Sequence, residues 1–271
     1  MSTDGTPAFA LIGERLNTHR EDLRVKVFER DKDYVIREAR RQQKAGATHL
    51  DIHAGGSGPK ELEEMLWILE TILPVLKENV GIVVDSSSPE CLSRALFRIQ
   101  GRPNTIVNAI TNDAERMRTV LPLAVQHGTG VIAILSHGPN PSRTADERLN
   151  AAEALRKAMV EAGIPDSKQY FDPQVLPLGF DPCQPKAVLE TLREIKRRWP
   201  FVHTIVGLSN ISFNVPGRSL LNRTFLAMLL ASGIDGAILD PRDKTLRKTL
   251  LSARALLGQD DFLADYLANA E

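Results

Sequence analysis

Short apolar runs rich in β-branched residues alternate along the chain with longer stretches whose apolar positions recur every three or four residues. The short runs are typical of buried strands, and the longer stretches are typical of helices that bury one face. The predicted strands cover 8–12, 48–53, 81–85, 105–108, 130–135, 169–172, 203–207 and 235–240. The predicted helices cover 31–45, 59–76, 89–98, 113–126, 145–162, 184–197, 218–232 and 243–257. The pattern therefore predicts eight strand–helix units in succession.

The helix that begins at Pro59 illustrates the helical pattern. Proline suits the first helical turn, where its missing N–H would have no partner. The apolar side chains expected to form one buried stripe are Leu62, Met65, Leu66, Leu69, Leu73 and Leu76. The glutamates Glu61, Glu63 and Glu64 are expected on the opposite, exposed face.

Alternating strands and helices imply a parallel sheet, because each helix carries the chain back across one face of the sheet. Eight such units close most naturally into a single (β/α)8 TIM barrel, an α/β fold. The competing architecture is an open, doubly wound sheet, which would favour a GxGxxG turn after the first strand. The segment from Gly13 to Asn17 has the sequence GERLN, so the barrel is the preferred prediction.

Composition and charge narrow the class of protein. Apolar residues make up 42% of the 271 residues, so the chain can bury a sizeable core. The 34 basic residues balance 34 acidic ones, which argues against bulk nucleic-acid binding. No apolar run reaches the roughly 18 residues of a membrane span, and the polar N-terminus has no secretory pattern. We therefore expect one cytoplasmic domain over 1–271 with a flexible N-terminus at 1–6, and no membrane partner.

Polar side chains interrupt the apolar runs at or just after the carboxyl ends of the predicted strands. They are Glu14, Asn17, Asp51, His53, Asp85, Asn108, Ser136, His137, Asp172, Ser209, Asn210 and Asp240. In a parallel barrel these ends lie at one mouth, where barrel enzymes have their active sites. A single such residue could instead cap the next helix, but caps are expected a few positions later. Asp85, Asn108 and Asp172 occupy the last positions of their strands.

Carboxylates and amides at such a mouth suit a flat, nitrogen-rich heterocycle. A carboxylate can accept two parallel N–H bonds from an amidine-like edge, such as N3–H and the 2-amino group of a pterin. The amide of an asparagine can donate a hydrogen bond to a neighbouring carbonyl of such a ring. A phosphate-binding barrel would instead have glycine-rich turns after strands seven and eight, whereas Gly207 and Gly236 lie within predicted strands.

The sequence offers less support for other classes of enzyme. The GxSxG, P-loop and HExxH motifs do not occur, and no lysine ends a strand, which argues against a Schiff-base aldolase. His49 and His53 share a strand face with Asp51, but a structural or substrate-facing role is favoured over a metal site. Cys91 and Cys183 make neither a disulfide scaffold nor a CxxC pair. We predict no bound metal, and a differently catalytic barrel, such as a decarboxylase, stays an alternative.

Several short motifs occur in a characteristic order. They are 12–17 (IGERLN), 50–51 (LD), 84–86 (VDS), 107–108 (VN), 171–173 (FDP), 207–210 (GLSN) and 222–225 (NRTF). As a set they resemble the methyltetrahydrofolate:corrinoid methyltransferases, which include the enzymes acting on corrinoid/iron-sulfur proteins. These are pterin-binding TIM barrels related to the folate module of cobalamin-dependent methionine synthase. The resemblance runs from about residue 8 to about residue 257.

The resemblance implies that a pterin binds in the barrel mouth. Matched position by position, Asp85, Asn108 and Asp172 correspond to the residues that hydrogen-bond the pterin ring. Asn17 and Asp51 line the same pocket in the family pattern.

The resemblance also implies a transferase that moves a methyl group between N5 of tetrahydrofolate and the cobalt of a corrinoid. Asn210 matches the asparagine that reaches N5 and is the expected catalytic residue, while Arg218 matches an arginine after strand seven. Because an amide is not a strong general acid, Asn210 would orient N5 and stabilise charge there. The corrinoid (cobalamin) would arrive on a separate protein, and the enzyme would be a homodimer. The sequence does not indicate which of the two directions of transfer is preferred.

The chain departs from the family pattern at three places. The second strand ends in His53 where relatives often have asparagine, the fifth ends in Ser136-His137 where some have Asn-Lys, and Phe213 stands where some have glutamine. These departures bear on which corrinoid protein is the partner, on the direction of transfer and on the upstream methyl donor. The residues that match the pterin-binding positions of the family are unchanged. The alternative is a dihydropteroate-synthase-like or other pterin-binding barrel without corrinoid chemistry, although no Ser-x-Arg-x-His segment occurs near the C-terminus.

Overall fold

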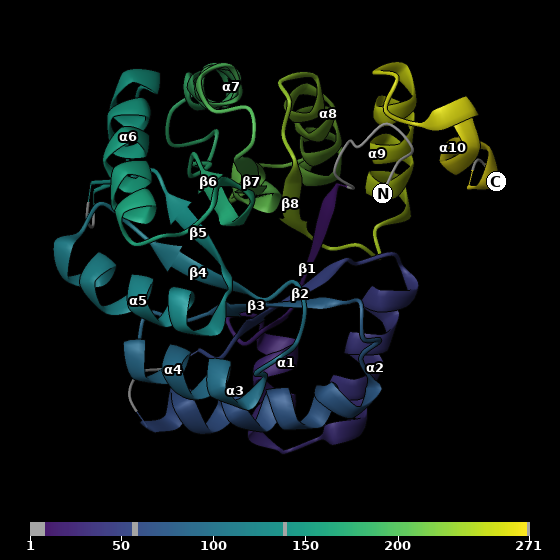
Figure 1. The fold of residues 1–271 in the computed structure, drawn as a ribbon. Helices are drawn as coiled ribbons and strands as arrows, with labels where there is room; N and C mark the ends of the chain where they lie inside the picture. Colours follow the sequence, from purple (N-terminus) through teal and green to yellow (C-terminus); the bar gives the residue numbers. More distant parts are fainter. Residues whose placement is uncertain (1–8, 56–58, 138–139, 270–271) are drawn as a thin grey trace.

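Eight parallel strands form one closed barrel in the computed structural model, which describes residues 9–55, 59–137 and 140–269 (Figure 1). Each strand pairs with its neighbours in the chain, and β8 closes the sheet against β1. The strands are β1 (Ala10–Asn17), β2 (His49–His53), β3 (Gly81–Asp85), β4 (Ile106–Ile110), β5 (Gly130–Ile134), β6 (Gln169–Asp172), β7 (His203–Gly207) and β8 (Gly236–Leu239). The predicted (β/α)8 barrel is confirmed, and the open sheet is excluded. The N-terminal segment 1–6 lies outside the described residues.

Helices surround the barrel and return the chain from each strand to the next (Figure 1). They are α1 (Glu21–Phe28), α2 (Lys32–Lys44), α3 (Pro59–Ile72), α4 (Pro89–Arg98), α5 (Ala114–His127), α6 (Ala145–Glu161), α7 (Gln184–Arg198), α8 (Arg218–Ala231), α9 (Lys244–Leu256) and α10 (Ala264–Ala268). The eight predicted helices are all present, with ends that differ by a few residues. The short helix α1 was not predicted, because it buries only Leu23 and Val27 and so has almost no apolar stripe.

Strand β1 extends five residues beyond its predicted end at Ile12. The register between β1 and β2 shifts between Gly13 and Leu16, which lets the strand continue as far as Asn17. Gly13 is needed there because a Cβ atom would lie 2.2 Å from Oε1 of Gln42. That oxygen accepts a hydrogen bond from the Arg15 backbone N–H at 3.1 Å, which ties the extended part of β1 to α2.

The buried face of α3 differs from the prediction. Met65 and Leu69 are buried as expected, but Leu62 and Leu66 are only half-buried. The predicted exposure of Glu61 and Glu64 was wrong, because both side chains are buried. Partners for their carboxylates explain the difference: Glu61 accepts a hydrogen bond from Ser86, and Glu64 lies 3.8 Å from the Lys60 ammonium. Ile68 and Ile72 complete the buried stripe.

The apolar core has two layers. A small cluster fills the inside of the barrel and consists of Ile12, Val83, Ile106, Ile132 and Ile205. Larger clusters lie between the strands and the surrounding helices. The β-branched side chains that marked the strands in the sequence therefore plug the barrel and form a rigid base beneath the carboxyl ends of the strands.

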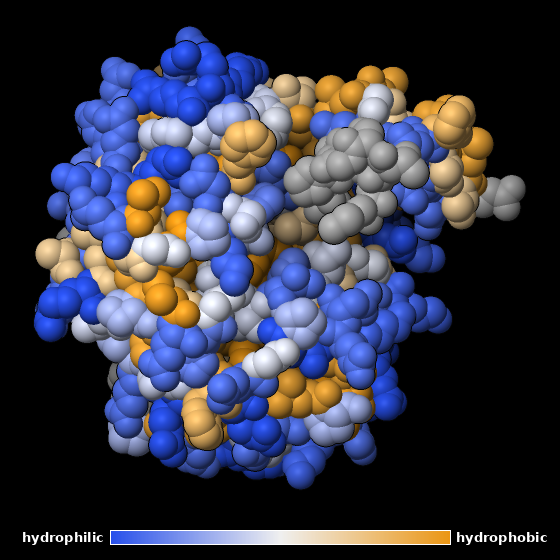
Figure 2. Space-filling model, viewed as in Figure 1, coloured by the Kyte–Doolittle hydropathy of each residue, from blue (hydrophilic) through white to orange (hydrophobic). Residues whose placement is uncertain are grey.

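The outer surface is largely hydrophilic, and apolar side chains gather near the C-terminal end of the chain, over α9 and α10 (Figure 2). Leu256, Phe262 and Leu267 are among the exposed large apolar residues there. Within the described ranges, no helix is both long and apolar enough to span a bilayer.

Candidate functional site

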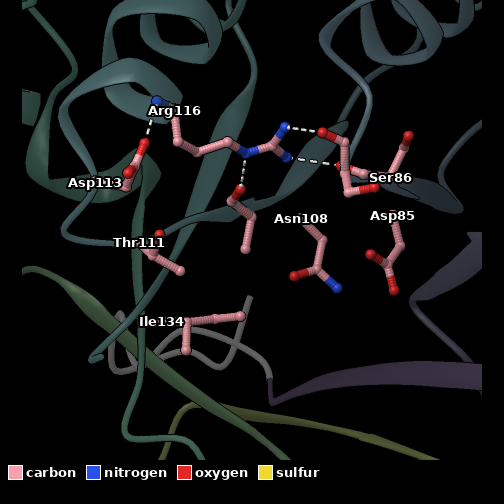
Figure 3. A pocket seen from close by; sticks show the side chains of 9 residues that line it. Asp85, Ser86, Asn108, Thr111, Asp113, Arg116 and Ile134 are labelled. Carbon is pink, nitrogen blue, oxygen red and sulfur yellow. Dashed lines mark hydrogen bonds between the residues drawn. The ribbon is translucent and has the colours of Figure 1, made fainter. Parts of the chain in front are cut away.

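A cavity of about 660 Å³ opens at the carboxyl ends of the strands. Its lining comprises Glu14, Asn17, His19, Arg20, Asp51, Asp85, Asn108, Ile134, Asp172, Gly207, Ser209, Asn210, Phe213, Arg218 and Ile238. All seven residues that the resemblance assigned to the site are in this set, drawn from six strands and the segments that follow them. Of the other polar residues noted at strand ends, Glu14 and Ser209 also line the cavity, whereas His53, Ser136, His137 and Asp240 do not. A second hollow of about 410 Å³, whose lining Figure 3 shows, shares Asp85, Asn108 and Ile134 with the first, so the two adjoin each other.

Three strands supply the first set of polar side chains in the cavity. Asp85 and Asp172 end β3 and β6 as predicted, whereas β4 continues to Ile110, two residues beyond its predicted end at Asn108. Asp85 pairs in register with Asn108 on the next strand, and Asp172 pairs with Ile134 of β5. The helices that follow β3 and β4 are capped by other residues: Ser88 accepts from the Cys91 N–H, and the Asp113 carboxylate caps α5. Helix capping therefore does not explain Asp85 and Asn108. Both side chains line the cavity, and the Asn108 side chain also hydrogen-bonds Asp51.

Burial changes the acidity of the carboxyl groups in the cavity. Burial raises the pKa of Asp172 to about 7, although the Gln174 backbone N–H and the Arg148 charge oppose the rise. Burial likewise raises the pKa of Asp85 to about 7, against the charge of Arg116. The pKa of Glu14 is raised by burial, despite a hydrogen bond from Ser209 at 3.0 Å. Near neutral pH Asp85 and Asp172 can thus accept hydrogen bonds when ionised and donate when protonated.

Asp51 is the most deeply buried carboxyl group of the set. Burial raises its pKa well above the ordinary value, the charge of Asp85 raises it further, and the Asn108 side chain lowers it. Its Oδ1 atom is buried without a hydrogen-bond partner among the described residues. Buried polar atoms are normally paired, so this orphan oxygen indicates a place where a ligand donor or a water binds.

The segment after β6 is held by a buried arginine that the sequence analysis did not identify. Arg148 on α6 is fully buried, and its guanidinium donates to the Pro173 carbonyl (2.6 Å) and to Oε1 of Gln184 (2.6 Å). Asp172 accepts a hydrogen bond from the Gln174 N–H at 2.7 Å. Arg148 therefore fixes the backbone just beyond Asp172, and one carboxylate oxygen of Asp172 is engaged locally.

The 3-10 turn Leu208–Ser212 follows β7, the strand next to β6 in the barrel, and carries Asn210. Arg218, the first residue of α8, donates to Oγ of Ser212 (3.1 Å) and to the Ser209 carbonyl (3.2 Å). A Cβ atom at position 207 would lie 3.0 Å from Nδ2 of Asn210, so any larger residue there would have to push the amide aside. The turn thus brings the Asn210 amide close to the strand end.

Two histidines lie near the mouth of the cavity. The rings of His19 and His53 stack with their centroids 4.4 Å apart, and burial lowers the pKa of His53 to about 4. Sequence reasoning missed His19 and Arg20, since they lie in the turn after β1, outside every recognisable pattern. Among the described residues, no group of three or more His, Cys, Asp or Glu side chains is arranged to hold a metal ion.

The cavity combines hydrogen-bond acceptors at its floor with an amide and two guanidinium groups nearer its rim. Such a floor can bind the N–H edge of a flat heterocycle, since carboxylates and amide oxygens accept and the Asn108 amide nitrogen can donate to a ring carbonyl. The rim residues Arg20, Asn210 and Arg218 can contact the parts of a ligand that project from the barrel.

Known proteins that are similar to this chain bind pterins or act on tetrahydrofolate, according to their names. A family model described as "Pterin binding enzyme" matches residues 13–240. A methylcorrinoid:tetrahydrofolate methyltransferase of Eubacterium limosum is 27% identical over 261 residues, covering 94% of each chain. The methionine synthase of Mycobacterium leprae is 27% identical over 248 residues, but this chain spans only 20% of its length.

Solved structures agree on the fold. Dihydropteroate synthase of Yersinia pestis, determined with a pterine–sulfa conjugate, superposes with a TM-score of 0.70 at 19% identity and covers 92% of this chain. A further structure of the same synthase gives a TM-score of 0.65 over 94% of each chain. Since the family model spans more than half of the sequence and the barrel agrees with it, this chain belongs to the pterin-binding enzyme family.

Proposed function

We propose that this protein is a methyltransferase that moves a methyl group between a corrinoid and tetrahydrofolate, with the pterin ring bound in the cavity at the barrel mouth. We favour transfer from the methylcorrinoid to N5, because this is the direction in the name of the Eubacterium limosum relative. In that direction the N5 lone pair forms a bond to the methyl carbon as the cobalt–carbon bond breaks, and the electron pair of that bond stays with cobalt. The proton on N5 is released to water.

The observation that carries the proposal is the convergence of Asp85, Asn108 and Asp172 on one cavity. Two carboxyl groups and one amide can satisfy the N–H groups and the carbonyl of a pterin ring together. Asn17 and Asp51 add a further amide and a carboxyl group with an unpaired buried oxygen. An aromatic ring with several N–H donors fits this set better than an anionic ligand, which the buried carboxylates would repel.

Asn210 is proposed to act at N5. It follows β7, which lies opposite β3 in the closed eight-stranded barrel, so it would reach the ring from the side away from Asp85. The other polar groups contact parts of the pterin whose bonding hardly changes during the reaction. A group at N5 would instead interact differently with the transition state and the bound substrate. Arg218 supports this turn through its bonds to Ser209 and Ser212.

The corrinoid is proposed to be carried by a separate protein that docks over the open mouth. Phe213 lines the cavity and its side chain is 55% exposed, which suits contact with an apolar surface brought by that partner. The corrinoid supplies the methyl group and accepts the electron pair. The residues of this chain bind the folate, orient N5 and exclude bulk water from the ring edge.

Three further features belong to the proposal. The chain 1–271 acts as a single barrel domain in the cytoplasm, and it forms a homodimer. The exposed apolar side chains Leu256, Phe262 and Leu267 are candidates for the contact between subunits. Sedimentation velocity at micromolar concentrations should give twice the monomer mass, and a monomer throughout would contradict the dimer.

The deciding experiment is anaerobic incubation of the purified protein with methylcobalamin and tetrahydrofolate. We expect 5-methyltetrahydrofolate to form together with cob(I)alamin, which is followed by its absorbance. Folate binding without transfer to or from any corrinoid would exclude the methyltransferase reaction. Condensation of a dihydropterin diphosphate with p-aminobenzoate by the same preparation would instead support a dihydropteroate-synthase activity.

A further inference from the structure

Arg116 joins the carboxyl ends of two strands beside the cavity. Its Nε atom donates to the Ala109 carbonyl at 2.8 Å, and its terminal nitrogens donate to the carbonyls of Ser87 (2.7 Å) and Ser86 (2.6 Å) (Figure 3). These carbonyls belong to the residues just after the cavity-facing side chains of β3 and β4. A planar guanidinium suits this task, because its N–H groups point in fixed directions.

The backbone of Arg116 is itself fixed. It lies in the first turn of α5, where its N–H donates to Oδ1 of Asp113, the residue that caps this helix, at 2.7 Å. The side chain therefore extends from a rigid helix end to both strand ends, as Figure 3 shows, and every one of its three bonds meets a backbone carbonyl. Bonds between a charged donor and carbonyls are stronger than bonds between neutral groups.

The charge of Arg116 also acts on the Asp85 carboxyl group. It lowers the pKa of Asp85, whereas burial and the charge of Glu61 on α3 raise it. Asp85 in turn raises the pKa of Asp51 on β2, its neighbour within the barrel. The groups that act on Asp51 are Asp85, Asn108 and Glu14, and none of the three is positive.

We propose that Arg116 is a positioning residue for the substrate, which holds the ends of β3 and β4 together and keeps a positive charge beside Asp85, so that both strands present their polar side chains to the pterin ring. The inference rests on the proposed function, because it assumes that Asp85 and Asn108 contact the folate. Two consequences follow. Asp85 is the member of the Asp51–Asp85 pair that loses its proton first, and folate affinity depends on the ionisation of Asp85.

The test compares Arg116→Gln, which removes the charge, with Arg116→Lys. The lysine keeps the charge but lacks the planar guanidinium that donates to three backbone carbonyls in fixed directions. Arg118→Gln is the matched control, since Arg118 lies two residues further along α5 and is exposed. Tetrahydrofolate affinity is measured by calorimetry from about pH 5 to pH 9, a range that spans the titration of a shifted carboxyl group. In the folate-free protein, the Asp85 carboxyl is titrated by carbon-13 NMR and assigned with Asp85→Asn.

We expect Arg116→Gln to move the titration midpoint of Asp85, and with it the midpoint of folate binding, upward by about one pH unit. At neutral pH its affinity should fall by about tenfold or more, the scale expected for losing charge-assisted bonds. Arg116→Lys should keep the wild-type midpoint but bind folate more weakly at every pH. Arg118→Gln should match wild type in both measurements.

An unchanged Asp85 midpoint in Arg116→Gln, or wild-type affinity in Arg116→Lys, would overturn the inference. If Arg116→Gln does not fold, as judged by circular dichroism, Arg116→Lys decides alone, and an altered midpoint in that variant counts against the inference. The NMR titration needs no folate. A wild-type protein that binds no tetrahydrofolate, but whose Asp85 midpoint still responds to Arg116→Gln, would therefore contradict the proposed function and not the role of Arg116 beside Asp85.

Discussion

Replacing Asn210 with alanine tests the proposed chemistry most directly. Asn210 is itself exposed, although its neighbours Leu208 and Ile211 in the turn are buried, so truncating its side chain removes no buried packing and the barrel should fold as before. Losing one hydrogen-bond donor at a site of changing charge typically lowers the rate by about 10²–10³. Since water can reach Asn210 and replace part of the lost interaction, we expect the lower end, about 10², at saturating folate.

The assay is single-turnover transfer between methylcobalamin and tetrahydrofolate, followed by cobalt absorbance in a stopped-flow instrument. Ser219→Ala serves as the control, because Ser219 is exposed on α8 and lies outside the cavity lining. Folate affinity of Asn210→Ala, measured separately, should stay close to that of wild type. A saturated rate equal to wild type, with only the affinity reduced, would refute the assignment and make Asn210 a binding residue.

Three other predictions concern the cavity. Asp172→Ala should weaken tetrahydrofolate binding by about 1–3 kcal/mol in calorimetry, because the ring N–H groups would lose a buried acceptor; wild-type affinity would contradict a pterin-facing role. Since burial raises the pKa of Asp172 from 3.8 to about 7, its protonation stabilises the fold at low pH. That contribution is lost as the pH rises between these values, so urea unfolding should show wild type losing more stability over this window than Asp172→Asn; parallel curves would disprove it. Gly207→Ala should slow methyl transfer with little change in folate affinity, because its Cβ would lie 3.0 Å from Nδ2 of Asn210, and an unaltered rate would mean that the amide can shift without loss.

The sequence pattern alone predicted the barrel and most of the polar residues at its mouth, whereas Arg218 and the role of Asn210 came from the family resemblance. Apolar β-branched runs and helical periodicity are local signals, and their regular alternation leaves few topologies that bury every strand. Polar residues that interrupt an apolar run near its carboxyl end can also be recognised without tertiary information. Because parallel strands all end at the same mouth, Asp85, Asn108 and Asp172 could be expected together although they are widely separated in the chain.

Only the tertiary structure reveals the burial, hydrogen bonds and pKa values that depend on contacts between residues distant in the sequence. Glu61 is buried because Ser86, from the end of another strand, supplies its hydrogen bond, and no periodicity along α3 could indicate that. Arg116 and Arg148 look like ordinary charged helix residues in the sequence, yet their guanidinium groups hold the strand-end backbones beside the cavity. The acidity of Asp85 likewise follows from burial and from a charge on another element. Side-chain type reveals which groups can react, whereas their protonation and orientation depend on long-range packing, which only the folded chain determines.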